Sequence, residues 1–489
     1  MRQMIINSLD LQVQTNCSID DHGNQSSTKI VRDKILFYKR VNTLLLNYPQ
    51  IIESVHEDLS AYAKDKFGKA ALTGRSGRKP IYTTENLFRA VIVKKMEAAT
   101  LRNASFLIAQ SMIFHDFCKL GLVETVDYSL ICRTEKAIQH HTWEKINQLL
   151  TTIGINAGLV DPEEARMDAT VMAVEVHYPA DVHQLWDCYR SMALRIRRIL
   201  KCFDSLPRVR FHERKVKKYY LDTIRFSKST SKQRKRDCHR WTKKLINSVS
   251  DAIQRTKTLV ETAIQIMSDS GKTTRWSIES DTDWLTLKYP VMEQIVDIAQ
   301  QRNDGEKVPN EKKVFSLFEN HVNLIIRGRA GIPFELGHKI FLSQSRSKFI
   351  LDYCVCQQNK SDTELLEQMT TRHEERFGKG SLKTVHADKG CRSKESEMKK
   401  IYQRVETVYV PSRLKDLHEP DLVDSQKFRA GIEGSISCLK RRFQLAKTRK
   451  RGYKSFCSEI GEAIFCHNLR ILCQSTAFEE FLVAESPPS

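Results

Sequence analysis

The 489-residue sequence predicts an α/β protein in which a mixed β-sheet is flanked by helices. Three observations predict this class. Residues 33–157 have the spacing of short helices, residues 158–189 and 318–475 contain β-branched strands that later alternate with helices, and a basic helical insertion at 190–317 separates those two stretches. A few early strands followed by alternating helices and strands is typical of a mixed sheet with helices on its faces.

The two ends of the chain are predicted to contribute little to this core. Residues 1–32 are polar and lack the apolar run of a signal peptide, so we expect a flexible leader, and residues 476–489 form a short tail. No run of about 18 apolar residues is present, which predicts that nothing spans a membrane. The sequence therefore favours a protein that works in an aqueous compartment.

The cysteines do not predict a zinc site. Thirteen cysteines occur without a repeated CxxC spacing. Cys354 and Cys356 are expected on one strand with their thiols on opposite faces, which is poor geometry for zinc. An odd number of cysteines without a secretion signal favours reduced thiols in a cytosol.

The net charge of +20 points to a polyanionic partner. The excess is clustered, because residues 190–244 carry 20 Lys and Arg against four Asp and Glu, with Tyr219, Tyr220 and Trp241 among them. Basic residues interleaved with aromatic ones suit a phosphate backbone together with base stacking. A solvated helical face remains an alternative for this block, and the two readings differ in whether nucleic acid binds there.

The helical stretch at 33–157 is interpreted as a DNA-binding region of the helix-turn-helix kind. In YTTENLFRAVIVKKMEAA, Thr84 is the predicted N-cap and Glu85 lies in the first turn. Further helical segments begin at TLRNASF and TEKAIQHH, and short helices joined by tight turns suit that module. An ordinary helical bundle fits the same pattern, so both readings stay open.

The strands of the sheet are predicted from alternation. RMDATVMAVEVHYP, residues 166–179, is β-branched and alternating, and strands resume after the insertion with HVNLIIRG, IPFELGHKIFLSQ and SKFILDYCVCQQ. Ser361 and Glu364 match a capping box that opens the next helix. SLKTVHADKGC then reads as a strand that ends at Asp388, and the last helix of the core starts near Asp424.

Three acids stand at matching places on these elements. Asp168 lies on the first strand, Asp388 ends a later strand, and Glu433 lies on the closing helix. Helical periodicity puts Glu433 on one stripe with Arg429 and Lys440. Glu433 could form a plain ion pair with Arg429, four residues away. It could also complete a carboxylate set for divalent metal, since two ions about 4 Å apart can stabilise both oxygens of a phosphodiester displacement.

These segments resemble the DDE-type insertion-sequence transposases, which have an RNase H-like catalytic core. MDATV is similar to the first-Asp strand, HADKG to the second-Asp segment, and RAGIEGSISCLK to the closing Arg-x3-Glu-x6-Lys segment. RGRAGIPFELGHKIFL also resembles the second strand of that core. The similarity covers roughly 80–189 and 318–475. It departs from the family pattern at Gln426, where an aromatic residue is common, and at the residues that follow Asp388.

The resemblance implies an enzyme. Asp168, Asp388 and Glu433 would bind two Mg²⁺, with Mn²⁺ as a possible substitute, to hydrolyse a phosphodiester at a transposon end and to join the freed 3′-hydroxyl to target DNA. The residues expected to contact DNA are Arg429, Lys440, Arg441 and Lys389. Partners would be duplex DNA, both inverted repeats and target, and a homodimer or larger assembly on DNA, without a membrane. A bacterial or archaeal cytoplasm, associated with the nucleoid, follows from the same resemblance.

Two other functions remain open from the sequence. A catalytically inactive, sequence-specific DNA-binding protein derived from a transposase would keep the fold, and the altered residues after Asp388 motivate this reading. A general nuclease with the same core would cut DNA without regard to sequence. Retention of all three acids favours the enzyme, because crowded carboxylates without metal repel one another.

Overall fold

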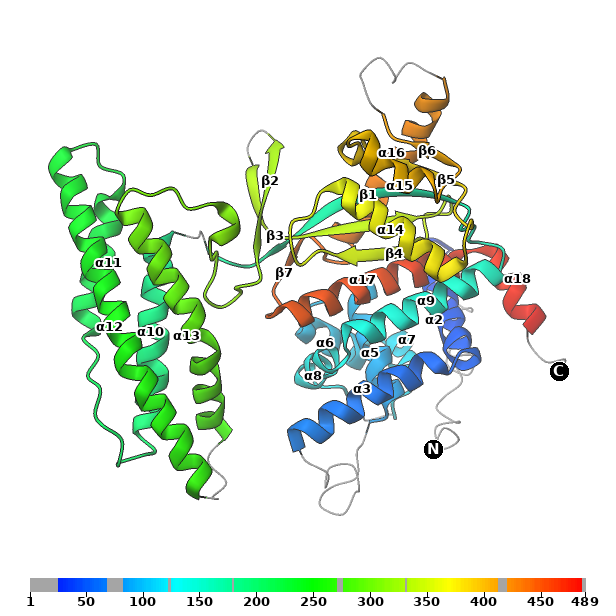
Figure 1. Ribbon diagram of the computed structural model, residues 1–489. Helices are drawn as coiled ribbons and strands as arrows, with labels where there is room; N and C mark the ends of the chain where they lie inside the picture. The colour runs from blue at the N-terminus through cyan, green and yellow to red at the C-terminus, as the bar shows by residue number, and fades with distance from the viewer. Residues whose placement is uncertain are drawn as a thin grey trace. The chain divides into compact units, whose positions relative to one another are not determined.

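The computed structural model describes residues 25–67, 82–121, 125–177, 180–270, 276–329, 332–411 and 420–485. These residues form a mostly helical α/β protein with one mixed sheet of seven strands (Figure 1). The chain divides into two compact units: unit 1 is Met1–Ala173 with His338–Ser489, and unit 2 is Val174–Gly337. Unit 2 therefore starts before and ends after the 190–317 insertion expected from the sequence.

Unit 1 begins with helices. Their bounds are α2 (Gln25–Asn47), α3 (Gln50–Phe67), α5 (Thr84–Met96), α6 (Leu101–Gln110), α7 (Met112–Phe117), α8 (Tyr128–Ala137) and α9 (His140–Asn156). Helix α2 starts inside the predicted leader, whose residues 1–24 lie outside the described part of the chain. The basic lead GRSGRKP at 74–80 also lies outside it.

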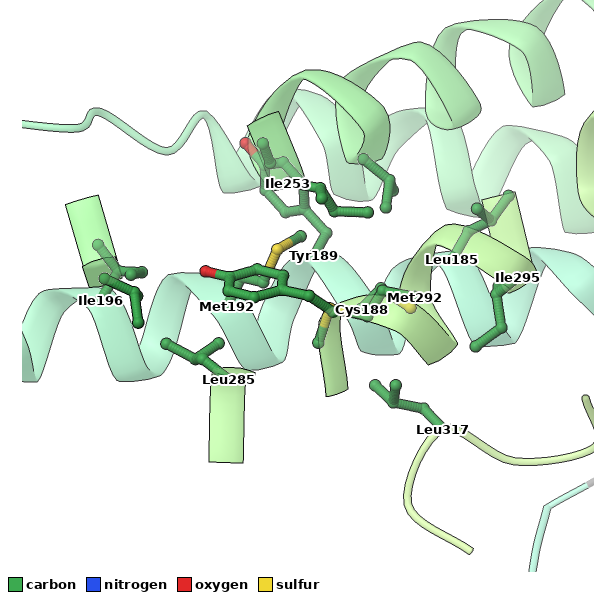
Figure 2. Close-up of a cluster of buried hydrophobic side chains, with 14 of the residues drawn as sticks. Leu185, Cys188, Tyr189, Met192, Ile196, Ile253, Leu285, Met292, Ile295 and Leu317 are labelled. Atoms are coloured by element: carbon green, nitrogen blue, oxygen red, sulfur yellow. The ribbon is translucent and has the colours of Figure 1, made fainter. Parts of the chain in front are cut away.

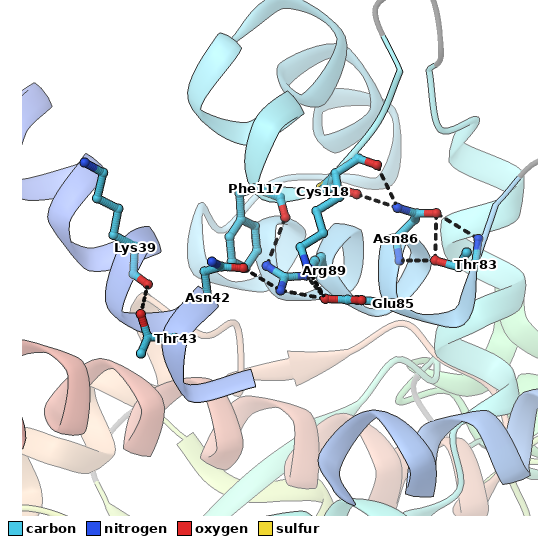
Figure 3. Close-up of polar contacts among 10 residues, drawn as sticks. Lys39, Asn42, Thr43, Thr83, Glu85, Asn86, Arg89, Phe117 and Cys118 are labelled. Atoms are coloured by element: carbon cyan, nitrogen blue, oxygen red, sulfur yellow. Dashed lines mark hydrogen bonds and ion pairs between the residues drawn. The ribbon is translucent and has the colours of Figure 1, made fainter. Parts of the chain in front are cut away.

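Helix α5 begins one residue earlier than the sequence indicated. Its N-cap is Thr83, not Thr84, because the Thr83 hydroxyl accepts from the backbone N–H of Asn86 while the Asn86 side chain accepts from the Thr83 backbone N–H. Asn at the third position therefore fills the role that Glu or Gln has in the usual capping box. The reciprocal bonds are drawn in Figure 3.

Helix α5 is buried along almost its whole length, from Asn86 to Met96. Even Arg89 is fully buried, where its guanidinium donates to Glu85, to Asn42 of α2 at 2.7 Å and to the carbonyl of Phe117 at 3.1 Å (Figure 3). A helix that reads a DNA groove needs an exposed face. Helix α5 is a central element of the bundle and presents no such face.

The sheet has the strand order β2-β3-β1-β5-β6, with β4 paired to β3 and β7 paired to β1. Strand pairs β1–β5 and β5–β6 are parallel, and β2–β3 and β3–β4 are antiparallel. The bounds are β1 (Glu164–Val174), β2 (Asn323–Arg329), β3 (Ile332–Gln344), β4 (Ile350–Val355), β5 (Thr384–Ala387), β6 (Thr407–Tyr409) and β7 (Lys447–Thr448). The first strand thus ends before the predicted residue 179.

Helices of the C-terminal half pack around the sheet in unit 1. They are α14 (Asp362–Phe377), α15 (Glu395–Tyr402), α16 (Pro420–Arg441), α17 (Tyr453–Gln474) and α18 (Thr476–Glu485), with a 3₁₀ turn η3 (Lys389–Cys391). Helix α16 packs on β5, whereas α17 packs on α9, α5 and β4. The predicted capping box of α14, Ser361 with Glu364, is confirmed. The N-terminal helices and most strands of the sheet therefore share unit 1, whereas β2 and the start of β3 belong to unit 2.

Unit 2 contains four long helices around an apolar core. These are α10 (Asp181–Leu200), α11 (Glu213–Ser227), α12 (Lys232–Ser270) and α13 (Trp276–Asn303), followed by a 3₁₀ turn η2 (Asn310–Lys312). Figure 2 shows the middle of this core, where Leu185, Cys188 and Met192 of α10 meet Ile253 of α12 and Met292 of α13. The core fixes which faces of the helices are left to solvent.

Candidate active site

The two aspartates end up at the same level of neighbouring parallel strands. The β1–β5 register runs from Glu164 opposite Thr384 to Met167 opposite Ala387. Asp168 is the next residue of β1, and Asp388 directly follows the last residue of β5. Because parallel strands run in the same direction, residues at matching register lie side by side at one edge. Strand pairing therefore brings together two acids that are 220 positions apart in the sequence.

Helix α16 is fixed over this edge by Arg166 of β1. The Arg166 guanidinium donates to the Phe428 carbonyl at 2.9 Å and lies 4.9 Å from the centroid of the Phe428 ring. Gly431 makes room for it, since a Cβ at that position would lie 2.1 Å from Arg166 Nη1. A glycine inside a helix usually costs stability. Here it lets the backbone of α16 approach the sheet closely, two residues before Glu433.

His386 of β5 is a second anchor for α16. Its Nδ1 lies 2.7 Å from the hydroxyl of Ser425, and its Nε2 lies 3.1 Å from Oε1 of Glu164 on β1. The imidazole also packs edge-on against the Phe428 ring. Burial lowers the pKa of His386 below its usual value. The neighbouring strands and the helix are thus joined through one neutral ring, which sets the place of Glu433.

Arg429 bridges two of the three acids. Its guanidinium is 3.1 Å from Oδ2 of Asp168 and 3.2 Å from Oε1 of Glu433, and its Nε donates to Gln426 at 3.1 Å. The Arg429 side chain is 13% exposed, whereas that of Glu433 is 63% exposed. The intrahelical ion pair that the sequence allowed for Glu433 is therefore present, and the same cation reaches the acid on β1.

The pKa of Asp168 is raised well above its usual value. This pKa is raised to about 6, mainly by burial and in addition by the carboxylates of Asp388 and Glu433. The backbone N–H of Ala169 and the Arg429 guanidinium act in the opposite direction without compensating. Both other predicted acids therefore act electrostatically on Asp168. A shift of this kind at a partly open carboxylate cluster is typical of functional sites, although ion-pair networks also produce it.

A fourth acid, Asp362 at the first position of α14, was missed by the sequence analysis. Its Oδ2 is the nearest atom to a Cβ built on Gly390, at 3.2 Å, and it pairs with Lys339 of β3 at 2.9 Å. The buried thiol of Cys391 has a raised pKa because of burial and of the nearby Asp362, Asp168 and Asp388. The signal available in the sequence was only the position after the N-cap Ser361, which any helix start can carry.

The predicted DNA-contacting cations lie at different distances from the acids along the chain. Lys389 directly follows Asp388, whose carboxylate accepts from the Lys389 backbone N–H at 2.8 Å, and its side chain is exposed. Lys440 lies two turns beyond Glu433 near the end of α16 and is half-buried, while Arg441 is exposed. Among the described residues, no three His, Cys, Asp or Glu side chains are arranged so that they could hold a metal ion as they stand.

The expectation for Cys354 and Cys356 was wrong. Side chains alternate along a strand with a period of two, so residues 354 and 356 share a face, and the ladder continues past β4 through the bond from the Cys356 backbone N–H to the Lys339 carbonyl at 3.0 Å. A hydrogen bond between the two thiols lowers the pKa of Cys354 to about 7. The two sulfurs therefore lie on the same side of the chain, away from the carboxylate site.

Comparison with protein-family models, with curated proteins and with solved structures finds no match to this chain. None of the helices in the described ranges combines the length and the hydropathy that crossing a bilayer requires.

Proposed function

We propose that the chain is a DDE-type DNA transposase with an RNase H-like core, which cleaves phosphodiesters at transposon ends and joins the 3′-hydroxyl to target DNA. One observation carries the proposal. Asp168 and Asp388 follow the same register step of two neighbouring parallel strands, and Glu433 on α16 acts electrostatically on Asp168. The mixed sheet with helices around it is compatible with the proposed core.

The carboxylates Asp168, Asp388 and Glu433 would hold two Mg²⁺, or Mn²⁺ in their place. Carboxylate oxygens are the donors that these hard ions prefer. The chemistry of the donor set supports this, because the pKa of Asp168 is raised by burial and by the two other acids, and a bound cation would offset that repulsion. When bound, the ions would stabilise the attacking and leaving oxygens of an in-line displacement.

The remaining residues have roles that follow from their positions. Arg429 holds Glu433 toward β1 and supplies part of the missing positive charge. Lys389, Lys440 and Arg441 would bind phosphate oxygens of duplex DNA near the end that is cut, since Lys and Arg make most protein contacts to phosphate. Two ends must be processed together, so we expect a homodimer or larger assembly on DNA.

Cleavage and strand transfer with DNA that carries the element's ends provide the test. We expect Asp168→Ala, Asp388→Ala and Glu433→Ala to lower the Mg²⁺-dependent rate by on the order of 10³-fold or more, with DNA binding retained. Asp424→Ala is the matched control, because Asp424 is an exposed acid of α16 that pairs locally with Lys427 at 3.0 Å. Equal loss in Asp424→Ala, or loss of DNA binding in all three variants, would contradict the proposal.

Metal binding can be measured without turnover. Calorimetry or electron paramagnetic resonance with Mn²⁺ should detect binding to the intact chain that weakens in Asp168→Asn. Unchanged Mn²⁺ affinity in that variant would remove the metal role from Asp168.

A second function, a DNA-binding protein without catalysis, is favoured by one observation. Arg429 lies across Asp168 and Glu433, so a cation already occupies the space between two of the proposed metal-binding acids. A pre-cut transposon end separates the two functions. Product of strand transfer from that end would eliminate the non-catalytic function, whereas tight binding without product under Mg²⁺ and Mn²⁺ would favour it.

A further inference from the structure

Charge is distributed unevenly within unit 2. Residues 213–244, which comprise α11, the connection and the first turns of α12, carry 13 Lys and Arg against three Asp and Glu. Helix α13 of the same bundle carries two Lys and Arg against five Asp and Glu. A merely basic protein would spread its cations over all four helices. The concentration on 213–244, here named the basic hairpin, calls for a specific counter-charge.

The basic hairpin is a pair of antiparallel helices with its own internal contacts. The rings of Tyr219 and Trp241 stack with centroids 5.3 Å apart, and Cys238 Sγ lies 3.6 Å from the carbonyl of Thr223. The contacting pair Thr223 and Cys238 lies closer to the connection than the pair Tyr219 and Trp241, as expected of two antiparallel helices joined by a short turn (Figure 1, α11 and α12). Val216 and Leu245 turn inward to the apolar core, which leaves the cationic faces outside.

Two aromatic rings of the hairpin, Tyr219 and Trp241, already contact cations of the same hairpin. Lys244 Nζ lies 4.7 Å from the centroid of the Trp241 ring and 5.7 Å from that of Tyr219, and the Arg240 guanidinium lies 5.3 Å from the Trp241 centroid. Stacked rings that also hold cations are not free to stack on unpaired bases. They act as a support that fixes the direction of the cations, so phosphate contact is favoured over base stacking here.

We propose that the basic hairpin binds the phosphate backbone of double-stranded DNA outside the carboxylate site. The exposed cations that would make this contact are Arg214, Lys215, Lys217, Lys218, Arg225, Lys228, Lys232, Arg234, Lys235, Arg236 and Lys243. The choice of DNA as the polyanion rests on the proposed function, whereas the choice of duplex over single strand rests on the engaged rings. The acidic α13 would repel DNA from the other side of the bundle.

The test compares two variants with the same change of net charge in the same unit. Arg236→Glu/Lys243→Glu changes two exposed residues of α12, and Lys307→Glu/Lys312→Glu changes two exposed lysines that follow α13. Binding of the full chain to a fluorescent duplex of arbitrary sequence is measured by anisotropy over a range of salt. We expect the hairpin variant to bind on the order of 10- to 100-fold more weakly at about 0.1 M salt. Its salt slope should fall by about 2, and the control should keep the slope of the unmodified chain.

Lysine acetylation followed by mass spectrometry maps the surface directly. Duplex should protect Lys232, Lys235 and Lys243 from acetylation while Lys307 and Lys312 stay reactive. Equal weakening in the two variants, or no protection of the hairpin, would overturn the proposal. Preference for single strands with quenching of Trp241 fluorescence would also overturn it, in favour of base stacking.

These outcomes are independent of catalysis. Asp168→Ala should bind the duplex through the hairpin as the unmodified chain does, so failure of the transposase proposal would leave the hairpin result intact. Hairpin variants that lose duplex binding while the chain still joins a short pre-cut end to target DNA at high protein concentration would separate the two surfaces.

Discussion

Unit 1 contains two groups of acids and cations that differ in how well their charges are balanced. In the first group, Glu462 of α17 lies 3.0 Å from Lys450 Nζ, 3.7 Å from Lys95 and 3.9 Å from Lys94, and Lys94 also pairs with Glu135. Burial alone would raise the pKa of Glu462. The ammonium groups of Lys450, Lys95 and Lys94 instead hold it well below its usual range.

The carboxylate site has the opposite balance. Asp168, Asp388 and Glu433 share Arg429 as the cation that contacts two of them, and the pKa of Asp168 rises to about 6 through burial and the other acids. A buried group with its charges paired joins α5, α8 and α17 and serves the fold. A cluster left short of positive charge costs stability, as expected of the proposed metal site when no metal is bound. Neutralising one acid should therefore lower the free energy of unfolding in the first group and raise it in the carboxylate site.

The largest effect is expected at the balanced group. Glu462→Gln leaves three ammonium groups without their shared carboxylate in a buried place, and we expect a loss of about 3–5 kcal/mol in the free energy of unfolding. Because the folded-state pKa of Glu462 is lowered, its contribution is present above the unfolded pKa and is lost only as the pH falls through the folded value. Urea unfolding at neutral pH measures the change.

Glu480→Gln is the matched control for this substitution. Glu480 is an exposed acid of α18, so the same chemical change there should stay within about 0.5 kcal/mol. If Glu462→Gln were equally mild, the buried group would not be what joins the N-terminal helices to α17.

Neutralising Asp168 should stabilise the folded state, the opposite of the effect expected for Glu462→Gln. A carboxyl group whose pKa is raised in the folded state lowers the protein's free energy of unfolding as the pH rises from the unfolded pKa near 4 through the folded pKa of about 6. Asp168→Asn should therefore raise the free energy of unfolding by about 1–2 kcal/mol at pH 7.5 in chelator, and by much less near pH 4. Thermal unfolding at the two pH values checks this. A variant that is less stable at pH 7.5 would mean that the Arg429 pair outweighs burial, and the contrast between the two groups would fail.

The smallest effect concerns the glycine that admits Arg166. Gly431→Ala places a methyl group 2.1 Å from Arg166 Nη1 and displaces a guanidinium that also bonds the Phe428 carbonyl and Gln344. We expect a loss of about 1–2 kcal/mol after the gain in helix propensity. The thermal midpoint and the Mn²⁺ affinity should fall together, since Arg166 sets the position of α16.

Gly434→Ala, one turn further along α16, gives the comparison. No atom lies within 4 Å of a Cβ at Gly434, so this change should stabilise the helix by up to about 1 kcal/mol. If the two glycine variants behaved alike, the close approach at Gly431 would not matter for the site.

Local features of the sequence were predicted well because they depend on neighbours in the chain. The strand that carries Asp168 and the capping box of Ser361 with Glu364 follow from residue patterns of a few positions. The N-cap of α5 was misplaced by one residue because Thr83 and Thr84 are equivalent in sequence, and only the bond to Asn86 distinguishes them. The thiols of Cys354 and Cys356 were misplaced because residues two apart on a strand lie on the same face, not on opposite faces.

By itself the sequence determined the sign and concentration of charge, the nature of the elements and the identity of the three acids, since each of these is a property of residues close together in the chain. The tertiary structure alone decided that Asp168 and Asp388 both follow the last paired residues of β1 and β5, that Gly431 lets α16 approach Arg166, and that Asp362 joins the acidic edge. It also decided that α5 is buried rather than exposed. These depend on which strands pair and which helices pack, and such choices are made by contacts between residues hundreds of positions apart, which no local pattern records.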